Sequence, residues 1–347
     1  MRIIHIANFS LRPKQAFFHN TERKLSNGFT RLGHAVLNVC DRDAVRMLGF
    51  GLRSIGAQRL APHLALLAEE LKPDLIVLGH AHAVSNEAVM AMREKAPQAK
   101  VAYWNVDAMF SDTVVQHLKS RLDVCEAIFS TSGGPGLAAL ARPGKIVGYM
   151  PNPTDKSVES ARAFENPAPD FDLFLATNSD GPGVRSHFGQ DVDFSAIGEK
   201  LRAAEPSFRF RHWVAAREGY LVGGKYQDVL AACRMGWNLN KRNDWTHFSS
   251  DRIAQFAGNG VLPLCPDEAK LAEVFGEDGA EYYSSEDDLL ERCARLARDD
   301  TTLRAKAKRV WELYHARFNE TEIARYLIEA TFGEFDPARV DWPSLMG

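Results

Sequence analysis

The chain has 347 residues and a mass of 38.6 kDa, enough for two domains of ordinary size. Apolar residues make up 45% of the sequence and charged residues 25%, which is typical of a globular protein that can bury a core in each half. The formal net charge of −3 excludes a nucleic-acid binder that relies on bulk positive charge, although it leaves room for a local basic cleft.

The cysteines and the N-terminal residues indicate a reduced, soluble setting. The cysteines are widely spaced, without any Cys-x-x-Cys pair: Cys40, Cys125, Cys233, Cys265 and Cys293. We interpret them as reduced structural thiols, mostly buried, rather than as zinc ligands. The start, MRIIHIANF, is too short for a secretory signal and fits a first strand. Because no apolar stretch reaches transmembrane length, we expect a cytoplasmic protein with at most peripheral membrane contact.

Short apolar runs alternate with helical segments through residues 1–150. The expected strands are residues 2–7, 35–40, 74–79, 101–105, 127–131 and 145–149. The expected helices are residues 19–32, 57–71, 85–95, 111–121 and 136–142. Continuously apolar strands such as DLIVLG are typical of a parallel sheet that helices cover on both faces. This alternation predicts a doubly wound α/β domain.

Residues 151–169, PNPTDKSVESARAFENPAP, interrupt the alternation with four prolines and many polar residues. Such a composition predicts a hinge or linker. A second α/β domain is then expected over residues 170–318, with strands at 171–176, 208–214, 236–240, 261–264 and 281–283 and helices at 193–204, 226–233, 251–257 and 268–275. Residues 285–332 are expected to be nearly all helical, and residues 319–347 to form a C-terminal helix and tail.

A polar loop in the second half is the strongest candidate for a ligand site. It separates the expected strand MGWNLN from the expected helix SDRIAQFA and contains Asn240, Lys241, Arg242, His247, Ser249, Ser250 and Arg252. Ligands of parallel α/β sheets bind beyond the carboxyl ends of the strands. Ser249 or Ser250 is a good helix N-cap, and a helix N-terminus can receive a phosphate. The loop therefore predicts a diphosphate site that needs no metal, against the simpler interpretation of a capped helix with solvated charges.

The same region resembles the spore-maturation-protein-like branch of group 1 glycosyltransferases. The features that carry the resemblance are Tyr226 on a helix, Leu239-Asn240 after a strand, Arg252 and Gln255 on the next helix, the turn Gly258-Asn259-Gly260, the strand VLPL and the acidic segment EYYSSEDDLLERCARL. The first half resembles the family only in its layout. One departure is Gln255, which stands where the family has a glutamate that contacts the donor's ribose. Glutamine can still hydrogen-bond to a sugar diol, but it carries no charge.

The resemblance implies a GT-B fold, with two doubly wound Rossmann-like domains facing a central cleft. It also implies a glycosyltransferase of glycan or cell-surface polysaccharide biosynthesis that moves a sugar from a nucleotide-sugar to a hydroxyl acceptor, with retention and without metal or cofactor. The donor-binding residues would be Asn178, Arg185, Tyr226, Asn240, Lys241, Arg242, Ser249, Ser250, Arg252 and Gln255. Among them, the cationic side chains would neutralise the leaving phosphate, and closure about residues 151–169 would exclude water.

Polar residues at the ends of the first-half strands are the expected acceptor and catalytic groups. His80 and His82 follow the strand DLIVLG, and Asp107 follows the next strand, so these three are the catalytic candidates. Trp104 is a possible sugar platform, and the segment after the first strand offers Asn8, Arg12 and Lys14 to an acceptor. Two histidines at i and i+2 without an apparent third ligand predict no metal. The simpler interpretation is that the histidines are ordinary strand-end residues.

Several alternatives stay open at this point. A sugar-nucleotide epimerase or hydrolase uses the same fold, as does a non-catalytic sugar-nucleotide-binding protein, because fold alone does not determine function. Gln255 also leaves room for a degenerate transferase. The acceptor could be a glycan, a lipid-linked molecule or a protein, and we expect no nucleic-acid partner. The sequence does not identify the base or the sugar of the donor.

Overall fold

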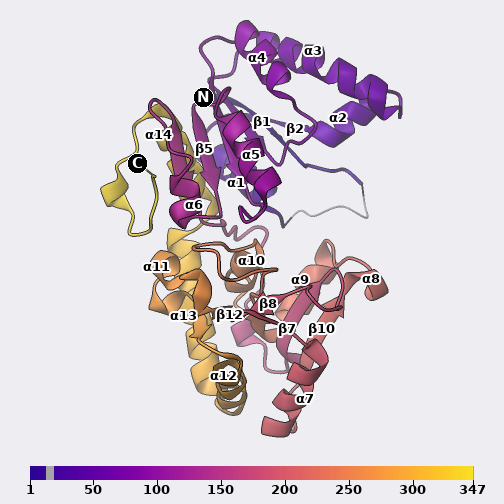
Figure 1. The fold of residues 1–347 in the computed structure, drawn as a ribbon, viewed down its shortest axis with the longest axis vertical. Helices are drawn as coiled ribbons and strands as arrows, with labels where there is room; N and C mark the ends of the chain where they lie inside the picture. The colour runs from indigo at the N-terminus through magenta and orange to yellow at the C-terminus, as the bar shows by residue number, and fades with distance from the viewer. Residues whose placement is uncertain (13–18, 347) are drawn as a thin grey trace. The chain divides into compact units, whose positions relative to one another are not determined.

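Two units of the chain are each built on a parallel sheet with helices packed around it (Figure 1). The computed structural model describes residues 1–12 and 19–346. The first unit comprises Met1–Pro151 together with Glu320–Gly347, and the second comprises Asn152–Asn319. The expected α/β class, with one parallel sheet in each half, is confirmed.

The first unit holds a six-stranded parallel sheet in the order β2-β1-β3-β4-β5-β6. Its strands are β1 (Arg2–Ala7), β2 (Ala35–Cys40), β3 (Leu75–Gly79), β4 (Lys100–Asn105), β5 (Ala127–Ser130) and β6 (Ile146–Tyr149). Its helices are α1 (Thr21–Arg31), α2 (Asp41–Leu48), α3 (Arg53–Leu71), α4 (Asn86–Lys95), α5 (Asp112–Arg121), α6 (Gly134–Ala138) and α14 (Glu320–Phe332). Every residue of β3 is buried, as its continuous apolar run predicts.

The expected strands of the first unit are confirmed to within a residue, but one helix was not predicted. That helix is α2, which begins directly after β2 with the charged run DRD. Its buried residues are Asp41, Ala44 and Val45, and its eight residues are fewer than the window over which a helical period is recognised. The segment expected at 136–142 is the short helix α6, which ends at Ala138.

The second unit holds a five-stranded parallel sheet in the order β10-β7-β11-β12-β13 and a small hairpin. The sheet strands are β7 (Phe171–Thr177), β10 (Phe210–Val214), β11 (Cys233–Trp237), β12 (Leu262–Pro266) and β13 (Glu281–Tyr283), and the hairpin strands are β8 (Ser186–His187) and β9 (Gln190–Asp191). The helices are α7 (Phe194–Ala204), α8 (Ala215–Glu218), α9 (Gly224–Ala231), α10 (Arg252–Gly258), α11 (Ala272–Phe275), α12 (Glu286–Arg298) and α13 (Asp300–Arg317).

The strand expected to reach Asn240 ends earlier, at Trp237. Beyond Trp237 the chain forms a turn that a side-chain hydrogen bond stabilises: the main-chain N–H of Asn240 donates to Oδ1 of Asn243 at 3.1 Å. The proline-rich segment that follows the first unit lies within the second unit. There the N–H of Thr154 donates to the carbonyl of Phe318, and the N–H of Ala163 donates to that of Asn259.

The cysteines are free and mostly enclosed in the core. All five cysteines are free thiols, and all but Cys40 are buried. Burial raises the pKa of the Cys125 and Cys265 thiols to about 12, so these groups stay protonated and unreactive. Among residues 1–12 and 19–346, no helix has the length and apolar character needed to cross a membrane.

Candidate functional site

Two arginines of the second unit meet on one backbone oxygen. Nε of Arg185 donates to the carbonyl of Leu239 at 3.1 Å, and Nη2 of Arg252 donates to the same oxygen at 2.8 Å. Arg185 lies in the loop after β7, and Leu239 lies just after β11, the strand paired with β7. Because the sheet is parallel, both loops leave it at the same edge, and α10 adds Arg252 from its first residue.

Neither guanidinium forms an ion pair with a carboxylate in the part of the chain that the structure describes. Burial, together with the charge of Arg252, lowers the pKa of Arg185 to about 9. Burial also lowers the pKa of Arg252, and its Nε is buried without a hydrogen-bond partner. The charge of Asp251 offsets part of this cost for Arg252, but two desolvated cations side by side stay costly without a hydrogen-bonded counter-charge. The arrangement is therefore a site that an anion would complete, with planar donors suited to phosphate oxygens.

The polar loop between β11 and α10 supports Arg252. Oδ1 of Asn240 accepts from Nη2 of Arg252 at 3.1 Å, and Nδ2 of Asn240 contacts the carbonyl of Phe248 at 3.4 Å. Ser249 is fully buried, and its hydroxyl donates to the Ser250 carbonyl and accepts from Asn238. Asn240 and Ser249 thus hold the loop, and Ser249 is enclosed by protein contacts rather than presented to a ligand.

The expected helix cap at Ser249 or Ser250 is wrong. The N-cap residue of α10 is Asp251, which has helical backbone angles and makes no side-chain cap hydrogen bond. Main-chain turns replace the cap, because the N–H of Ile253 donates to the Ser250 carbonyl. The helix has only seven residues, so the anion site rests on the guanidinium groups rather than on a helix N-terminus.

Gln255 and Tyr226 form a buried pair beside Arg252. The hydroxyl of Tyr226, on α9, donates to Oε1 of Gln255 at 2.8 Å, and both side chains are buried. The charge of Arg252 acts on the Tyr226 hydroxyl, which places the pair close to that guanidinium. Because Oε1 is engaged by Tyr226, the amide NH₂ of Gln255 is the group left to meet a ligand, as a hydrogen-bond donor.

The remaining donor-site candidates lie on the surface. Lys241 is exposed, while its carbonyl accepts from the N–H and hydroxyl of Ser186. Arg242 is exposed and pairs with Asp244, with Nη2 and Oδ2 2.7 Å apart, so its charge is already compensated. The side chain of Asn178 is exposed in the loop after β7. The structure thus brings Arg185, Asn240, Arg252, Gln255 and Tyr226 together and leaves Lys241, Arg242 and Asn178 at the periphery.

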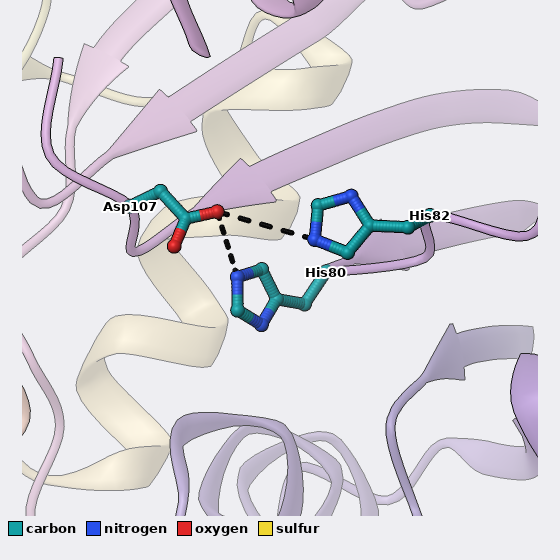
Figure 2. A group of neighbouring side chains, drawn as sticks. All are labelled: His80, His82 and Asp107. Atoms are coloured by element: carbon teal, nitrogen blue, oxygen red, sulfur yellow. Dashed lines mark hydrogen bonds and ion pairs between the residues drawn. The ribbon is translucent and has the colours of Figure 1, made fainter. Parts of the chain in front are cut away.

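A second cluster lies at the ends of β3 and β4 in the first unit (Figure 2). Nε2 of His80 and Oδ2 of Asp107 are 2.8 Å apart. Asp107 is held by Asn105, whose Nδ2 donates to the Asp107 carbonyl at 2.7 Å. His80 has a φ of 52°, a left-handed conformation that is uncommon outside glycine and often marks functional positions. The pair is therefore a fixed histidine–carboxylate dyad.

Electrostatics separates the two histidines of this cluster. Burial lowers the pKa of His80, but the hydrogen bond and charge of Asp107 outweigh it, so the net shift is upward. Burial and the charge of His80 lower the pKa of His82, which is therefore neutral at pH 7. Asp107 stays ionised, because the two histidines counter its burial and keep its pKa low.

The cluster also offers three possible metal ligands. One ligand atom from each of His80, His82 and Asp107 lies within 4.8 Å of the others, a donor set that zinc accepts. Asp107 could not be recognised as a third ligand from the sequence, because its contact with the histidines depends on the pairing of β3 with β4. The hydrogen bond between His80 and Asp107 accounts for their approach without an ion, and a metal-free site stays our prediction.

The acceptor residues expected in the first unit fare differently. Trp104 is fully buried, and its Nε1 donates to Nε2 of His5 at 3.1 Å, so it belongs to the core and does not fit a sugar platform. Asn8 directly follows β1, the neighbour of β3, and its Oδ1 is buried without a partner. Arg12 is exposed, and Lys14 lies outside the described residues.

A histidine of the expected strand 208–214 lies near the arginine pair. Nε2 of His212, on β10, is 2.7 Å from the hydroxyl of Thr177 at the end of β7. Burial, and next the charge of Arg185, lower the pKa of His212 to about 4. It is therefore a neutral hydrogen-bonding group close to the anion site. His212 is the central residue of the FRHWV strand, and the sequence shows no local sign that it approaches Thr177 of the neighbouring strand.

Known proteins share the fold of this chain. The family described as glycosyl transferase-like matches residues 184–329, a stretch that contains both arginines of the pair. AviGT4, a glycosyltransferase involved in avilamycin A biosynthesis, is 12% identical with a TM-score of 0.58, over 96% of this chain and 97% of that one. An α-glucosyltransferase solved with UDP and a mismatched 13-mer DNA is 14% identical with a TM-score of 0.60, over 96% and 100%. Sucrose-phosphate synthase from Thermosynechococcus elongatus is 12% identical with a TM-score of 0.57, over 96% and 98%.

These similarities show that the chain has the GT-B fold of two Rossmann-like domains. At sequence identities of 12–14%, the structural similarity establishes the fold but not the activity, which has to be argued from the residues of the site. Among curated proteins, none is similar enough in sequence to count as a relative.

Proposed function

We propose that this protein is a glycosyltransferase that moves a sugar from a nucleotide-sugar to a hydroxyl acceptor, without a metal ion and with retention of configuration. The observation that carries the proposal is the arginine pair, in which Arg185 and Arg252 share the Leu239 carbonyl without a carboxylate partner among the described residues. Similarity to the glycosyl transferase-like family over residues 184–329 supports it, as does the GT-B fold. Within group 1 glycosyltransferases, we assign the chain to the spore-maturation-protein-like branch.

The donor would bind the second unit through its diphosphate. As the bond to the sugar breaks, negative charge grows on the leaving nucleotide, and preorganised cations stabilise that charge most effectively in a desolvated site. Arg185 and Arg252 are already desolvated, so they would supply the charge that other enzymes take from a metal. Lys241 would add a third, mobile cation from the same loop. The amide of Gln255 would donate a hydrogen bond to the donor in place of the ribose contact of the family glutamate.

The acceptor would bind the first unit near His80 and Asp107. Because Asp107 accepts the proton on Nε2, the free lone pair of neutral His80 is on Nδ1. That atom would accept a hydrogen bond from a hydroxyl and so orient it. In the retaining scheme that we propose, the hydroxyl attacks the sugar on the same face from which the nucleoside diphosphate departs, and the departing phosphate takes the hydroxyl proton.

The acceptor class follows from the family resemblance and the charge of the chain. We propose a glycan or lipid-linked acceptor in cell-surface polysaccharide biosynthesis, with the reaction in the cytoplasm. One protein of the same fold was solved with DNA. For this chain we propose no nucleic-acid acceptor, because its net charge is −3.

The test is an activity screen with a panel of nucleotide-sugars, with and without sugar and glycan acceptors. We expect one donor to yield free nucleoside diphosphate and a glycosylated product in the presence of EDTA. Proton NMR of the product's anomeric centre would report retention. Arg185→Met and Arg252→Met should abolish turnover, whereas Arg242→Met should preserve it because Arg242 is exposed and paired with Asp244.

Two results would replace the proposal. Conversion of the donor alone, with a new sugar stereoisomer or free sugar as the only product, would identify an epimerase or hydrolase on the same fold. Tight nucleotide-sugar binding without turnover of any donor would identify a binding protein or a degenerate transferase.

A further inference from the structure

An exposed apolar surface lies on the hairpin formed by α2 and α3 in the first unit. Of ten exposed large hydrophobic side chains among the described residues, five lie between residues 47 and 66. We name these five the α2–α3 patch: Met47, Phe50, Leu52, Ile55 and Leu66. Phe50 is 87% exposed, Met47 62% and Leu52 60%. Single exposed apolar residues need no explanation, but such a concentration marks a surface that meets another apolar phase.

The patch continues along one face of α3. Ile55, Pro62 and Leu66 are exposed and spaced by seven and four residues, which places them on the same side of the helix. The opposite side is the buried one, with Gly56, Leu60, Leu64 and Ala68. In Figure 1, α2 and α3 lie at the rim of the first unit's sheet. The helix therefore has one face that packs on its own unit and a second face whose apolar side chains the described residues leave exposed.

The turn that carries the patch is held in place by close backbone contacts. A Cβ on Gly56 would come within 1.7 Å of the Val45 carbonyl, so α2 and α3 touch at a position that only glycine allows. Phe50 has a φ of 50°, a conformation that costs free energy for a bulky residue. A strained and almost fully exposed phenylalanine in a tightly packed turn indicates a role for that side chain outside the fold.

Arginines outnumber carboxylates at the turn that carries the patch, since residues 41–59 contain four arginines and two aspartates. Residues 44–68 contain three arginines and no aspartate or glutamate. Arg53 is exposed, and the guanidinium of Arg59 lies 5.9 Å from the centroid of the Phe50 ring. Arg46 forms an ion pair with Asp43, and Asp41 is buried, while Glu69 and Glu70 lie at the far end of α3. This local excess of positive charge stands out in a chain whose net charge is −3.

We propose that the α2–α3 patch docks on an anionic lipid surface, with Phe50, Met47 and Leu52 inserted among the acyl chains and Arg53 and Arg59 at the headgroups. Exposed apolar side chains ringed by arginines are the combination that binds interfacial, negatively charged membranes. The contact is peripheral, because no helix among residues 1–12 and 19–346 could cross a bilayer. A second copy of the chain is the alternative occupant, and the experiment below distinguishes it from a lipid surface.

Co-sedimentation of the purified chain with vesicles tests the proposal. Vesicles of phosphatidylcholine alone are compared with vesicles containing phosphatidylglycerol, at low and at high salt. We expect binding to the anionic vesicles only, weakened by salt. The double variant Phe50→Ser/Leu52→Ser should lower the partition coefficient at least about tenfold, because two buried apolar side chains are lost. Arg53→Ser/Arg59→Ser should abolish the preference for anionic lipid.

The control variant is Met90→Ser, which removes an exposed apolar side chain of α4 outside the patch and should leave binding unchanged. All replaced side chains are exposed, and circular dichroism with a thermal melt confirms that each variant folds. The proposal is overturned if the wild-type chain ignores anionic vesicles, or if the Phe50→Ser/Leu52→Ser variant binds them equally well. It is also overturned if light scattering shows a dimer that this variant dissociates, because the patch would then join two copies of the chain.

Discussion

Arg252 offers the sharpest test of the anion site. Its guanidinium donates to the Leu239 carbonyl and to Oδ1 of Asn240, while its Nε has no partner. A phosphate oxygen at that position would gain a charge-assisted hydrogen bond. Removing such a bond costs about 1.5–3 kcal/mol. We therefore expect Arg252→Met to weaken the binding of uridine diphosphate, or of whichever nucleoside diphosphate binds the wild-type chain, by about 10- to 150-fold.

The same substitution should leave the unliganded protein nearly as stable as before. Methionine fills a similar volume, and no carboxylate is stranded, because Arg252 is not ion-paired with one in the described chain. The Leu239 carbonyl keeps its hydrogen bond from Arg185. Oδ1 of Asn240 loses its hydrogen bond from Arg252, which costs about 1–3 kcal/mol, but removing a desolvated cation beside Arg185 offsets part of that cost. We therefore expect the free energy of unfolding to change by less than about 2 kcal/mol.

Isothermal titration calorimetry of nucleoside diphosphates against wild type, Arg252→Met and Arg242→Met separates a binding role from a structural one. Arg242 lies on the same loop but is exposed and paired with Asp244, so it is a matched control of equal charge. We expect its loss to change the dissociation constant less than about threefold, as for most exposed ion pairs. Equal affinities for wild type and Arg252→Met, or equal damage from the two substitutions, would refute the assignment of the anion site.

Three further predictions concern titration, the glutamine and a buried carboxylate. Asp107→Asn should move the acid limb of the pH–rate profile to lower pH, because Asp107 is what raises the pKa of His80; an unmoved limb would exclude His80 as its source. Gln255→Glu should weaken nucleotide binding at least about tenfold, since a carboxylate there would neutralise Arg252, whereas a large gain of activity would identify a degenerate transferase. The pKa of Glu281 is held low by Lys306, Arg292 and Arg295 despite its burial, so its charge stabilises the fold above its unfolded pKa of about 4.3, and this stability is lost as the pH falls through its folded pKa. Glu281→Gln should therefore flatten the acid side of a plot of unfolding free energy, measured with urea, against pH. An unchanged slope would contradict this.

The sequence predicted the sheets well because buried parallel strands are continuous apolar runs. It also singled out Arg185 and Arg252 as candidates for a ligand site, since loops after such strands are where ligands bind. It did not predict that they converge on the Leu239 carbonyl, because that contact joins residues far apart in the chain through the pairing of β7 with β11. The order of the strands in a sheet is set by tertiary packing rather than by local pattern.

The individual errors have equally physical causes. Trp104 was expected at a surface, but the last residues of β4 are as buried as its central ones, so an aromatic side chain there packs into the core. The serine cap failed because the main chain around Ser250 already closes the first turn of α10. Both errors come from assigning a role by position in an element, where the deciding quantity was the burial of the side chain or the competing main-chain bond.

The last helix of the chain completes the first unit rather than the second. α14 packs against α1, its Tyr326 ring lies 5.3 Å from that of Phe129 on β5, and the Tyr326 hydroxyl donates to the carbonyl of Ser344. On the ribosome, the residues up to Pro151 therefore emerge long before the helix that covers them, whereas Asn152–Asn319 emerges as one uninterrupted unit. The second unit can thus fold before the first unit, which keeps part of its core exposed until α14 has been synthesised. A nascent chain stopped at Asn319 should accordingly resist protease over the second unit and be cut within the first.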